Sequence, residues 1–232
     1  MLLTRTSEPM TSSLTRRAAA ELIGTAFLLM AIIGSGIMAE RLSDGNAAIT
    51  LLGNSISVGA ALVCLILAFG PVSGAHFNPA VTLVDSILGP FAWKELPVYF
   101  AAQIAGAFLG VALANLMFDL PAFHASEKVR FGFSQLLAEL VATAGLILVI
   151  YGTLHKDAKA VPYAVAAFIT SAFWFTSSTS FANPAVTIAR SMSNTFAGIR
   201  PMDVPAFVIV EFVAALVAVL LARWIFQIED DE

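Results

Sequence analysis

The sequence predicts an all-α membrane protein in which six transmembrane helices and two re-entrant half-helices form an inverted repeat. Three observations support this prediction. Hydrophobic residues make up 59% of the 232 residues and charged residues only 12%, which is unlike a soluble domain. Six apolar stretches are long enough to cross a bilayer core of about 30 Å, which needs roughly 20 residues. The tripeptide Asn-Pro-Ala occurs twice, starting at Asn78 and Asn183, where apolar runs are interrupted.

The apolar stretches define the expected spans. They lie at about 16–40, 47–69, 95–118, 131–154, 161–177 and 203–226. Such continuous blocks favour helices over a barrel, whose strands would alternate apolar and polar residues. The first span is too long for a signal-peptide core, so we expect it to remain in the protein. Residues 14–226 are expected to form a single domain with repeats at about 14–118 and 131–226, between a disordered tail at 1–13 and an acidic tail at 227–232.

Each Asn-Pro-Ala motif is expected to begin a short helix. Asn caps a helix by accepting a backbone N–H bond, and Pro fits the first helical position because its missing N–H would have no partner there. Two such helices that meet end to end in the membrane would direct two positive dipole ends at one point. We expect this point to be a pore centre, where Asn78 and Asn183 donate side-chain N–H groups to a solute and the helix ends repel cations. The alternative is that both side chains only cap helices.

The two halves of the chain repeat each other. Residues 20–25 (AELIGT) return as residues 138–143 (AELVAT). Because each half contains three spans, the halves must have opposite orientations in the membrane, and the solute path should lie between them. A modest excess of basic residues on the side of both termini predicts cytoplasmic termini. Ala102, Gly106 and Gly110 recur at every fourth position, which predicts close helix contact.

These features resemble the major intrinsic proteins, the family of aquaporins and aquaglyceroporins. The similar segments are SGAHFNPAVTL, the second NPA, the paired AEL-x-x-T segments and YFAAQIAGAFLG, and the resemblance covers residues 16–226. It implies the aquaporin fold and a passive channel, without enzymatic activity, cofactor or metal. It also implies a homotetramer with one pore per protomer in the lipid bilayer of a bacterial inner membrane, and no nucleic-acid partner.

The resemblance further implies roles for the backbone and for two buried acids. A polar solute in hydrocarbon needs replacement partners, since an unpaired polar group costs several kcal/mol there. The family fold would supply a ladder of carbonyl acceptors. Its expected members are Gly74, Ala75, His76, Thr179, Ser180, Phe181 and Ala182. Glu21 and Glu139 would brace the two loops by accepting backbone N–H bonds, with proton transport as the alternative. Glu211 stands in the repeat position of Gln103 and receives no role.

The selectivity filter departs from the main branches of the family. Counted along an ungapped alignment, its positions are Val58, Ser171, Ser180 and Val186. A water-specific member would have Phe, His, a small residue and Arg, and Thr187 stands where a glycerol channel would have Asp. We therefore expect a filter that is wider and less cationic, and still partly polar.

Two charged residues are candidates for the pore mouths. Arg190 and Asp85 each lie seven residues beyond an NPA asparagine, on the same face of the half-helix as Val186 and Val81. Arg190 is expected to reach over the outer vestibule and partly replace the missing arginine, and Asp85 to mark the cytoplasmic mouth. The alternative is that both pair with loops or lipid headgroups. His76 is expected to position its loop, with pH sensing as the alternative.

The second motif is most similar to that of bacterial channels associated with arsenic-resistance operons, which also reads NPAVTIAR. This similarity implies a passive channel for water, glycerol-type polyols and arsenous acid, with room for methylated arsenicals. Three alternatives remain at this point. They are a water-selective aquaporin, a proton-coupled secondary transporter that uses Glu21, Glu139 and Glu211, and a non-conducting junctional protein.

Overall fold

The computed structural model describes residues 12–228, so residues 1–11 and 229–232 of the two expected tails lie outside the described range. The α-helices of this range are α1 (Leu14–Leu42), α2 (Ala47–Ser73), α3 (Pro79–Leu88), α4 (Leu96–Met117), α5 (Phe133–Lys156), α6 (Val161–Phe175), α7 (Pro184–Arg190) and α8 (Val204–Phe226). Short 3-10 turns at Trp93–Glu95, Ala158–Ala160 and Pro201–Asp203 lead into α4, α6 and α8. Within this described range, six helices are long and apolar enough to cross a membrane. The predicted fold class, with its six spans and two half-helices, is confirmed.

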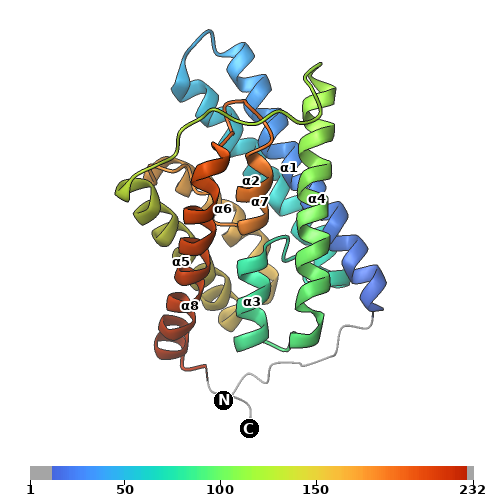
Figure 1. Cartoon of the computed structure of the whole chain (residues 1–232). Coiled ribbons are helices and arrows are strands. Elements are labelled where there is room, and N and C mark those ends of the chain that lie inside the picture. The colour runs from blue at the N-terminus through green and yellow to red at the C-terminus, as the bar shows by residue number, and fades with distance from the viewer. Residues whose placement is uncertain (1–11, 229–232) are drawn as a thin grey trace.

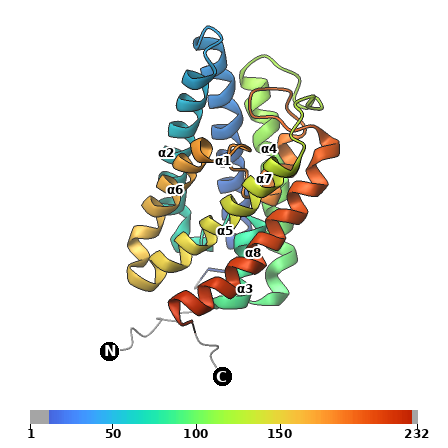
Figure 2. The same ribbon diagram turned by 90° about the vertical axis from the view of Figure 1, so that its left-hand side faces the viewer.

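The packing of the helices follows the predicted inverted repeat. Helix α1 packs against α2 and α4, and α5 packs in the same way against α6 and α8. Helix α2 contacts α6 across the interface, α3 packs on α8, and α7 packs on α4. Exchanging the first four helices with the last four therefore maps each contact onto an equivalent one. The short helices α3 and α7 lie one above the other in the middle of the bundle (Figure 1). Figure 2 shows that α1 begins and α8 ends at the same end of the molecule.

The local sequence explains where several helices begin. Asn46 caps α2 by accepting hydrogen bonds from the N–H groups of Ala48 and Ile49. Helices α4, α6 and α8 each have a proline in the first turn, where its missing N–H has no helical partner to lose.

Small residues bring α4 close to α1. A Cβ atom on Gly106 would overlap the carbonyl of Leu22, and one on Gly110 would overlap the carbonyl of Ala26. Ala102, in the same row of α4, is also buried. The expected close contact is therefore present, and it allows the two backbones to touch.

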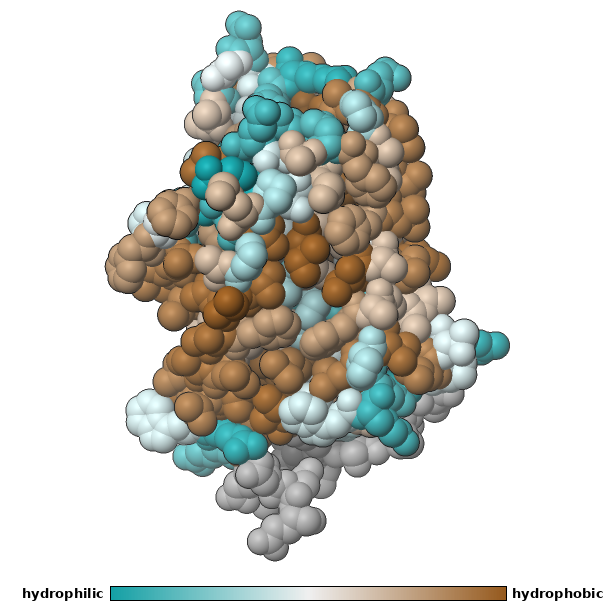
Figure 3. Space-filling model, in the orientation of Figure 1, coloured by the Kyte–Doolittle hydropathy of each residue, from teal (hydrophilic) through white to brown (hydrophobic). Residues whose placement is uncertain are grey.

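The outer surface suits a lipid environment. Figure 3 shows a broad apolar band between hydrophilic caps at the two ends of the molecule. Large apolar side chains of α8, such as Ile209, Leu220 and Trp224, are exposed. In water such a continuous surface would be unfavourable, whereas hydrocarbon covers it without cost.

Candidate functional site

The two Asn-Pro-Ala motifs meet at the middle of the molecule. Asn78 Oδ1 accepts from the Ala80 N–H at 2.9 Å, and Asn183 Oδ1 accepts from the Ala185 N–H at 3.0 Å, so each side chain caps its half-helix. Asn78 Nδ2 donates to the Ala182 carbonyl at 2.8 Å, and Asn183 Nδ2 donates to the Phe77 carbonyl at 2.8 Å. The positive ends of α3 and α7 thus face one another.

These crossed bonds correct one expectation from the sequence. The amide nitrogens were expected to be free for a solute, but each already holds the opposite loop. An Asn amide has two N–H groups, so one donor remains on each side chain. Both side chains are at most 5% exposed. The central asparagines therefore join the two halves and still keep a donor each.

The loops before the two motifs have the same unusual backbone. The residues with positive φ are Ala75 (51°), Phe77 (49°), Thr179 (65°), Ser180 (50°) and Ala182 (48°). Ala75 and Phe77 correspond to Ser180 and Ala182 in the repeat. Left-handed backbone is costly for residues with a side chain and persists where surrounding contacts enforce it. Both loops must therefore be held in place by the surrounding helices.

Free carbonyls are found at nearly all the positions expected for the ladder. Within residues 12–228, no hydrogen bond reaches the carbonyls of Gly74, Ala75, His76, Thr179, Ser180 or Phe181. The exception is the Ala182 carbonyl, which accepts from Asn78, so we remove Ala182 from the ladder. The other six remain available as acceptors for a solute.

Two buried glutamates hold the strained loops. Glu21 accepts from the N–H groups of His76 at 3.0 Å and Phe77 at 2.7 Å. Glu139 accepts from the N–H groups of Phe181 at 2.9 Å and Ala182 at 2.7 Å. Both carboxyl groups are fully buried. The same two backbone N–H groups are bound in each repeat, which is the bracing arrangement expected from the sequence.

Each brace is completed by a polar side chain from the last helix of its half. Gln103, the eighth residue of α4, donates from Nε2 to Glu21 at 2.8 Å and to Thr82 at 2.9 Å. Glu211, the eighth residue of α8, accepts from Thr187 Oγ1 at 2.6 Å and from the Asn183 N–H at 3.3 Å, and its second oxygen has no hydrogen-bond partner among the described residues. Two neighbouring buried carboxyl groups, here those of Glu139 and Glu211, cannot both be ionised without a large cost. We therefore expect Glu211 to be protonated, the state in which it would act as a donor as Gln103 does; the sequence argument left the role of this residue open.

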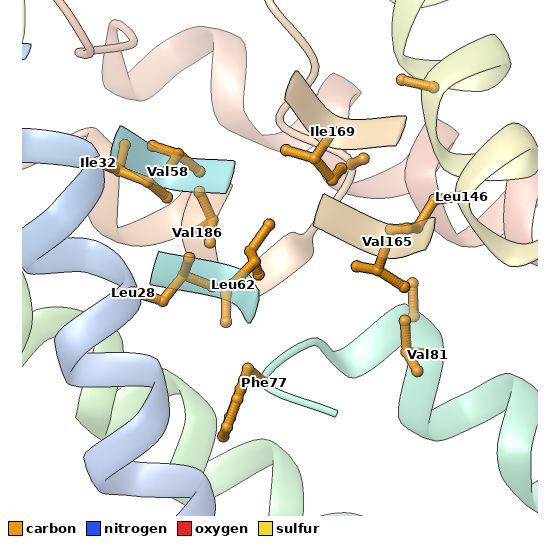
Figure 4. Packing of buried hydrophobic residues seen from close by; sticks show 14 of the residues in the cluster. Leu28, Ile32, Val58, Leu62, Phe77, Val81, Leu146, Val165, Ile169 and Val186 are labelled. Carbon is orange, nitrogen blue, oxygen red and sulfur yellow. The ribbon is translucent and has the colours of Figure 1, made fainter. Parts of the chain in front are cut away.

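Buried apolar side chains gather on the α7 side of the motifs. Figure 4 shows Val58 of α2 and Val186 of α7 on one side and Val165 and Ile169 of α6 on the other. Val58 is 1% exposed, Val186 2% and Ile169 8%. Ser180 is also buried, and its hydroxyl has no hydrogen-bond partner among the described residues. The positions expected for the filter on α2 and α7 are thus apolar and buried, and Ser180 adds one hydroxyl without a partner among the described residues.

The position expected for the filter on α6 was wrong. Ser171 is exposed, and its hydroxyl donates to the Phe168 carbonyl of the same helix at 2.8 Å. It shares this outer face with Tyr163 and Trp174, whereas Ile169 lies on the buried face. Two residues rotate an α-helix by about 200°, so Ser171 and Ile169 lie on opposite faces of α6. We propose Ile169 as the α6 residue of the filter in place of Ser171.

The two mouth candidates lie deeper than expected. Arg190 is 2% exposed, and its Nε donates to the Ala197 carbonyl while its guanidinium lies 3.4 Å from the centre of the Phe181 ring. The segment after α7 covers this side chain, so Arg190 does not reach over a vestibule. Asp85 accepts from Tyr151 at 3.2 Å and lies 3.5 Å from His76 Nε2. Asp85 is thus part of a polar cluster towards the end where α8 ends.

A cavity at the opposite end contains residues that the sequence argument missed. We call it the distal cavity; its volume is about 330 Å³ and it is lined by Ala47, Leu51, Lys128, Val129, Arg130, Gln135, Ser177, Thr179 and Phe196. Thr179 begins the second run of free carbonyls. Lys128 and Arg130 belong to the segment between α4 and α5, which has no periodic pattern or motif. Only the folded chain brings these basic side chains next to the loop of the second motif.

Comparisons with known proteins agree with this geometry. The family model described as major intrinsic protein matches residues 8–169. An aquaglyceroporin, AqpS from Rhizobium meliloti, is 51% identical over 214 residues, which cover 92% of this chain and 91% of that protein. Aquaporin NIP1-1 from Zea mays is 39% identical over 135 residues, or 57% of this chain and 47% of that protein. The X-ray structure of the aquaglyceroporin from Plasmodium falciparum has the same fold, with a TM-score of 0.71 at 22% identity over 92% of this chain and 97% of that chain.

Proposed function

The chain belongs to the major intrinsic protein family, and from that premise we propose that it is a passive transmembrane channel for small uncharged solutes. The observation that carries the proposal is the pair of half-helices whose asparagines cross-bond at mid-molecule, Asn78 to Ala182 and Asn183 to Phe77. Their facing positive ends disfavour cations. The free carbonyls on either side supply acceptors for a neutral solute.

The apolar composition of the proposed filter favours the passage of solutes larger than water. Val58, Ile169 and Val186 bring no donor and no charge to the constriction, so solute hydroxyl groups can bond only to the free carbonyls and the Ser180 hydroxyl. A solute with an apolar side and several hydroxyl groups fits such a path. We propose water, glycerol-type polyols and arsenous acid as solutes, and methylated arsenicals as further ones. The identity of 51% to a protein named an aquaglyceroporin supports the polyols.

The buried glutamates favour a channel over a proton-coupled transporter. Glu21 accepts from two backbone N–H groups and from Ser73 and Gln103. Glu139 likewise accepts from two backbone N–H groups. Proton transport would require these acceptors to release the strained loops in each cycle.

We further propose that the protein lies in a bacterial inner membrane as a homotetramer with both chain ends in the cytoplasm. The apolar band of the surface supports the membrane setting. In this orientation the distal cavity opens outwards and Asp85 lies on the cytoplasmic side. The excess of basic residues near the end where α1 begins is the support for the orientation.

Flux through proteoliposomes tests the proposed function. Stopped-flow swelling with water, glycerol and arsenous acid should show rates that are linear in solute concentration, have a low activation energy and do not respond to a pH gradient. The control is liposomes with Asn78→Asp and Asn183→Asp protein, in which charged carboxylates replace the central donors and should reduce flux. Saturating flux driven by a pH gradient would identify a transporter instead, and flux of water alone would identify a water-selective channel.

A further inference from the structure

The distal cavity has an unusual balance of charge. Two basic side chains, Lys128 and Arg130, line it, and among the described lining residues none is acidic. Thr179 adds a hydroxyl group, whereas the Ser177 hydroxyl already donates to the Ser134 carbonyl and the Gln135 amide donates one N–H to the Ser177 carbonyl and keeps a second. A cavity of this composition is rich in hydrogen-bond donors and has a positive potential, which suits a small anion with several oxygen atoms.

Arg130 is fixed by two backbone carbonyls, one in the loop that precedes the second motif and one in the segment after α7. Its Nε donates to the Gly198 carbonyl at 2.8 Å and its Nη1 donates to the Ser178 carbonyl at 2.7 Å. Burial lowers its pKa to about 10, so the guanidinium stays charged at neutral pH. Arg130 thus gives the cavity a permanent positive charge and holds the backbone directly before Thr179.

Lys128 is the less constrained of the two cations. Its Nζ donates to the Phe196 carbonyl at 2.6 Å and lies 4.4 Å from the centre of the Phe196 ring. An ammonium group has three donors, so two remain for a ligand. Burial, followed by the charges of Arg130 and Arg190, lowers the pKa of Lys128 to about 8, and Glu40 acts in the opposite direction. The charge of Lys128 is therefore present at neutral pH and is lost as the pH rises through about 8.

We propose that the distal cavity is a binding site for small oxyanions and that Lys128 is the side chain that selects them. The arginine that the family usually has directly after the second motif is replaced here by Val186. Lys128 would instead supply a positive charge at the mouth of the pore, away from the filter position. An oxyanion held beside Thr179 obstructs the entrance to uncharged solutes. The consequence for flux rests on the proposed channel function, whereas the binding itself does not.

Binding of inorganic sulfate to the purified protein tests the proposal directly. Sulfate keeps its charge across neutral and alkaline pH, so any change in its affinity reports on the protein. Isothermal titration calorimetry should give saturable binding below pH 8, and the affinity should fall as the pH rises above this value, because the ammonium of Lys128 loses its proton. A charge-assisted hydrogen bond contributes about 1.5–3 kcal/mol, so the expected loss is roughly tenfold or more.

Three variants separate the charge of Lys128 from its other contacts. Lys128→Met should lose sulfate affinity at all pH values by roughly tenfold. Lys128→Arg should bind sulfate and no longer lose it in the alkaline range, since a guanidinium keeps its proton. The matched control is Lys159→Met, which removes one charge from an exposed residue at the other end of the molecule, and it should bind as the natural protein does.

The outcomes are distinct. The proposal is overturned if the natural protein does not bind sulfate, if Lys128→Met binds it as well as Lys159→Met does, or if the alkaline loss persists in Lys128→Arg. A flux measurement tests the consequence for transport. External sulfate should slow glycerol flux through the natural protein at neutral pH, and should slow flux through Lys128→Met much less. Sulfate binding without any glycerol flux would leave the site standing and remove the proposed channel function.

Discussion

Glu211 in α8 provides a test of how the second loop is held. Its equivalent in the first half is Gln103, which donates to Glu21 and Thr82. If Glu211 is a protonated acid, then Glu211→Gln preserves its shape and its donor, as Gln103 does. Glu211→Leu preserves the approximate volume but removes every polar contact. The two variants should therefore differ strongly in stability.

The contacts of Glu211 set the size of the difference. Glu211→Leu leaves the Asn183 N–H and the Thr187 hydroxyl without their acceptor. A buried group without a partner costs about 1–3 kcal/mol, so two such groups would cost about 2–6 kcal/mol. Thr187 can turn its hydroxyl to the Asn183 carbonyl, as Thr82 does to Asn78 at 3.0 Å, so we expect the lower half, about 2–4 kcal/mol. Glu211→Gln should change stability by less than about 1 kcal/mol.

Thermal unfolding of the purified proteins in one detergent measures this difference. Infrared spectroscopy adds an independent readout, because a carboxylic acid has a C=O band that a carboxylate lacks, and this band should weaken in Glu211→Gln. Equal destabilisation by Glu211→Gln and Glu211→Leu, with no change in the carboxylic acid band, would mean that Glu211 is ionised. The description of Glu211 as a protonated acid would then be refuted.

Three further predictions concern the filter, the packing and the buried arginine. Ile169→His should reduce glycerol flux at least several-fold because it places a larger polar ring in the filter, whereas Ser171→His should leave flux unchanged because it lies on the outer face. Stopped-flow swelling compares the two variants. A larger effect of Ser171→His would mean that Ser171, and not Ile169, is the filter residue of α6. Gly106→Leu should lower the yield of folded protein, since its side chain would overlap α1; normal yield and melting temperature would refute the close contact. Arg190→Met should lower stability by about 1–3 kcal/mol through the loss of a charged hydrogen bond and a ring contact, and flux assays should show an unchanged solute preference. A changed solute preference with an unchanged melting temperature would mean that Arg190 lies in the outer vestibule.

Local patterns were enough to predict most of the fold. Span length follows from apolar runs, and each half-helix follows from Asn before Pro at its first position. The bracing roles of Glu21 and Glu139 were implied by the resemblance to the family, since each acid bonds to a loop 42 or more positions away. For the spans and the half-helices the signal lies within a few residues of the feature that it predicts.

The features that were missed depend on contacts between distant segments. The filter position on α6 depends on the number of residues in the loop between Phe175 and Asn183, and an error of two residues turns the helix face around. The burial of Arg190 depends on how the segment after α7 folds back to Ala197. Lys128 reaches Phe196 across 68 positions of the chain. No periodic pattern in the sequence reports such distances.

The apolar filter is most directly tested by Val186→Arg. Val186 is 2% exposed and lies near Val58 (Figure 4), so an arginine there would add a charge and narrow the proposed constriction. Stopped-flow swelling of proteoliposomes that contain equal amounts of natural and variant protein should show that glycerol flux falls several-fold more than water flux. Equal losses for glycerol and water would contradict the assignment of Val186 to the filter, and with it the conclusion that this pore admits solutes larger than water.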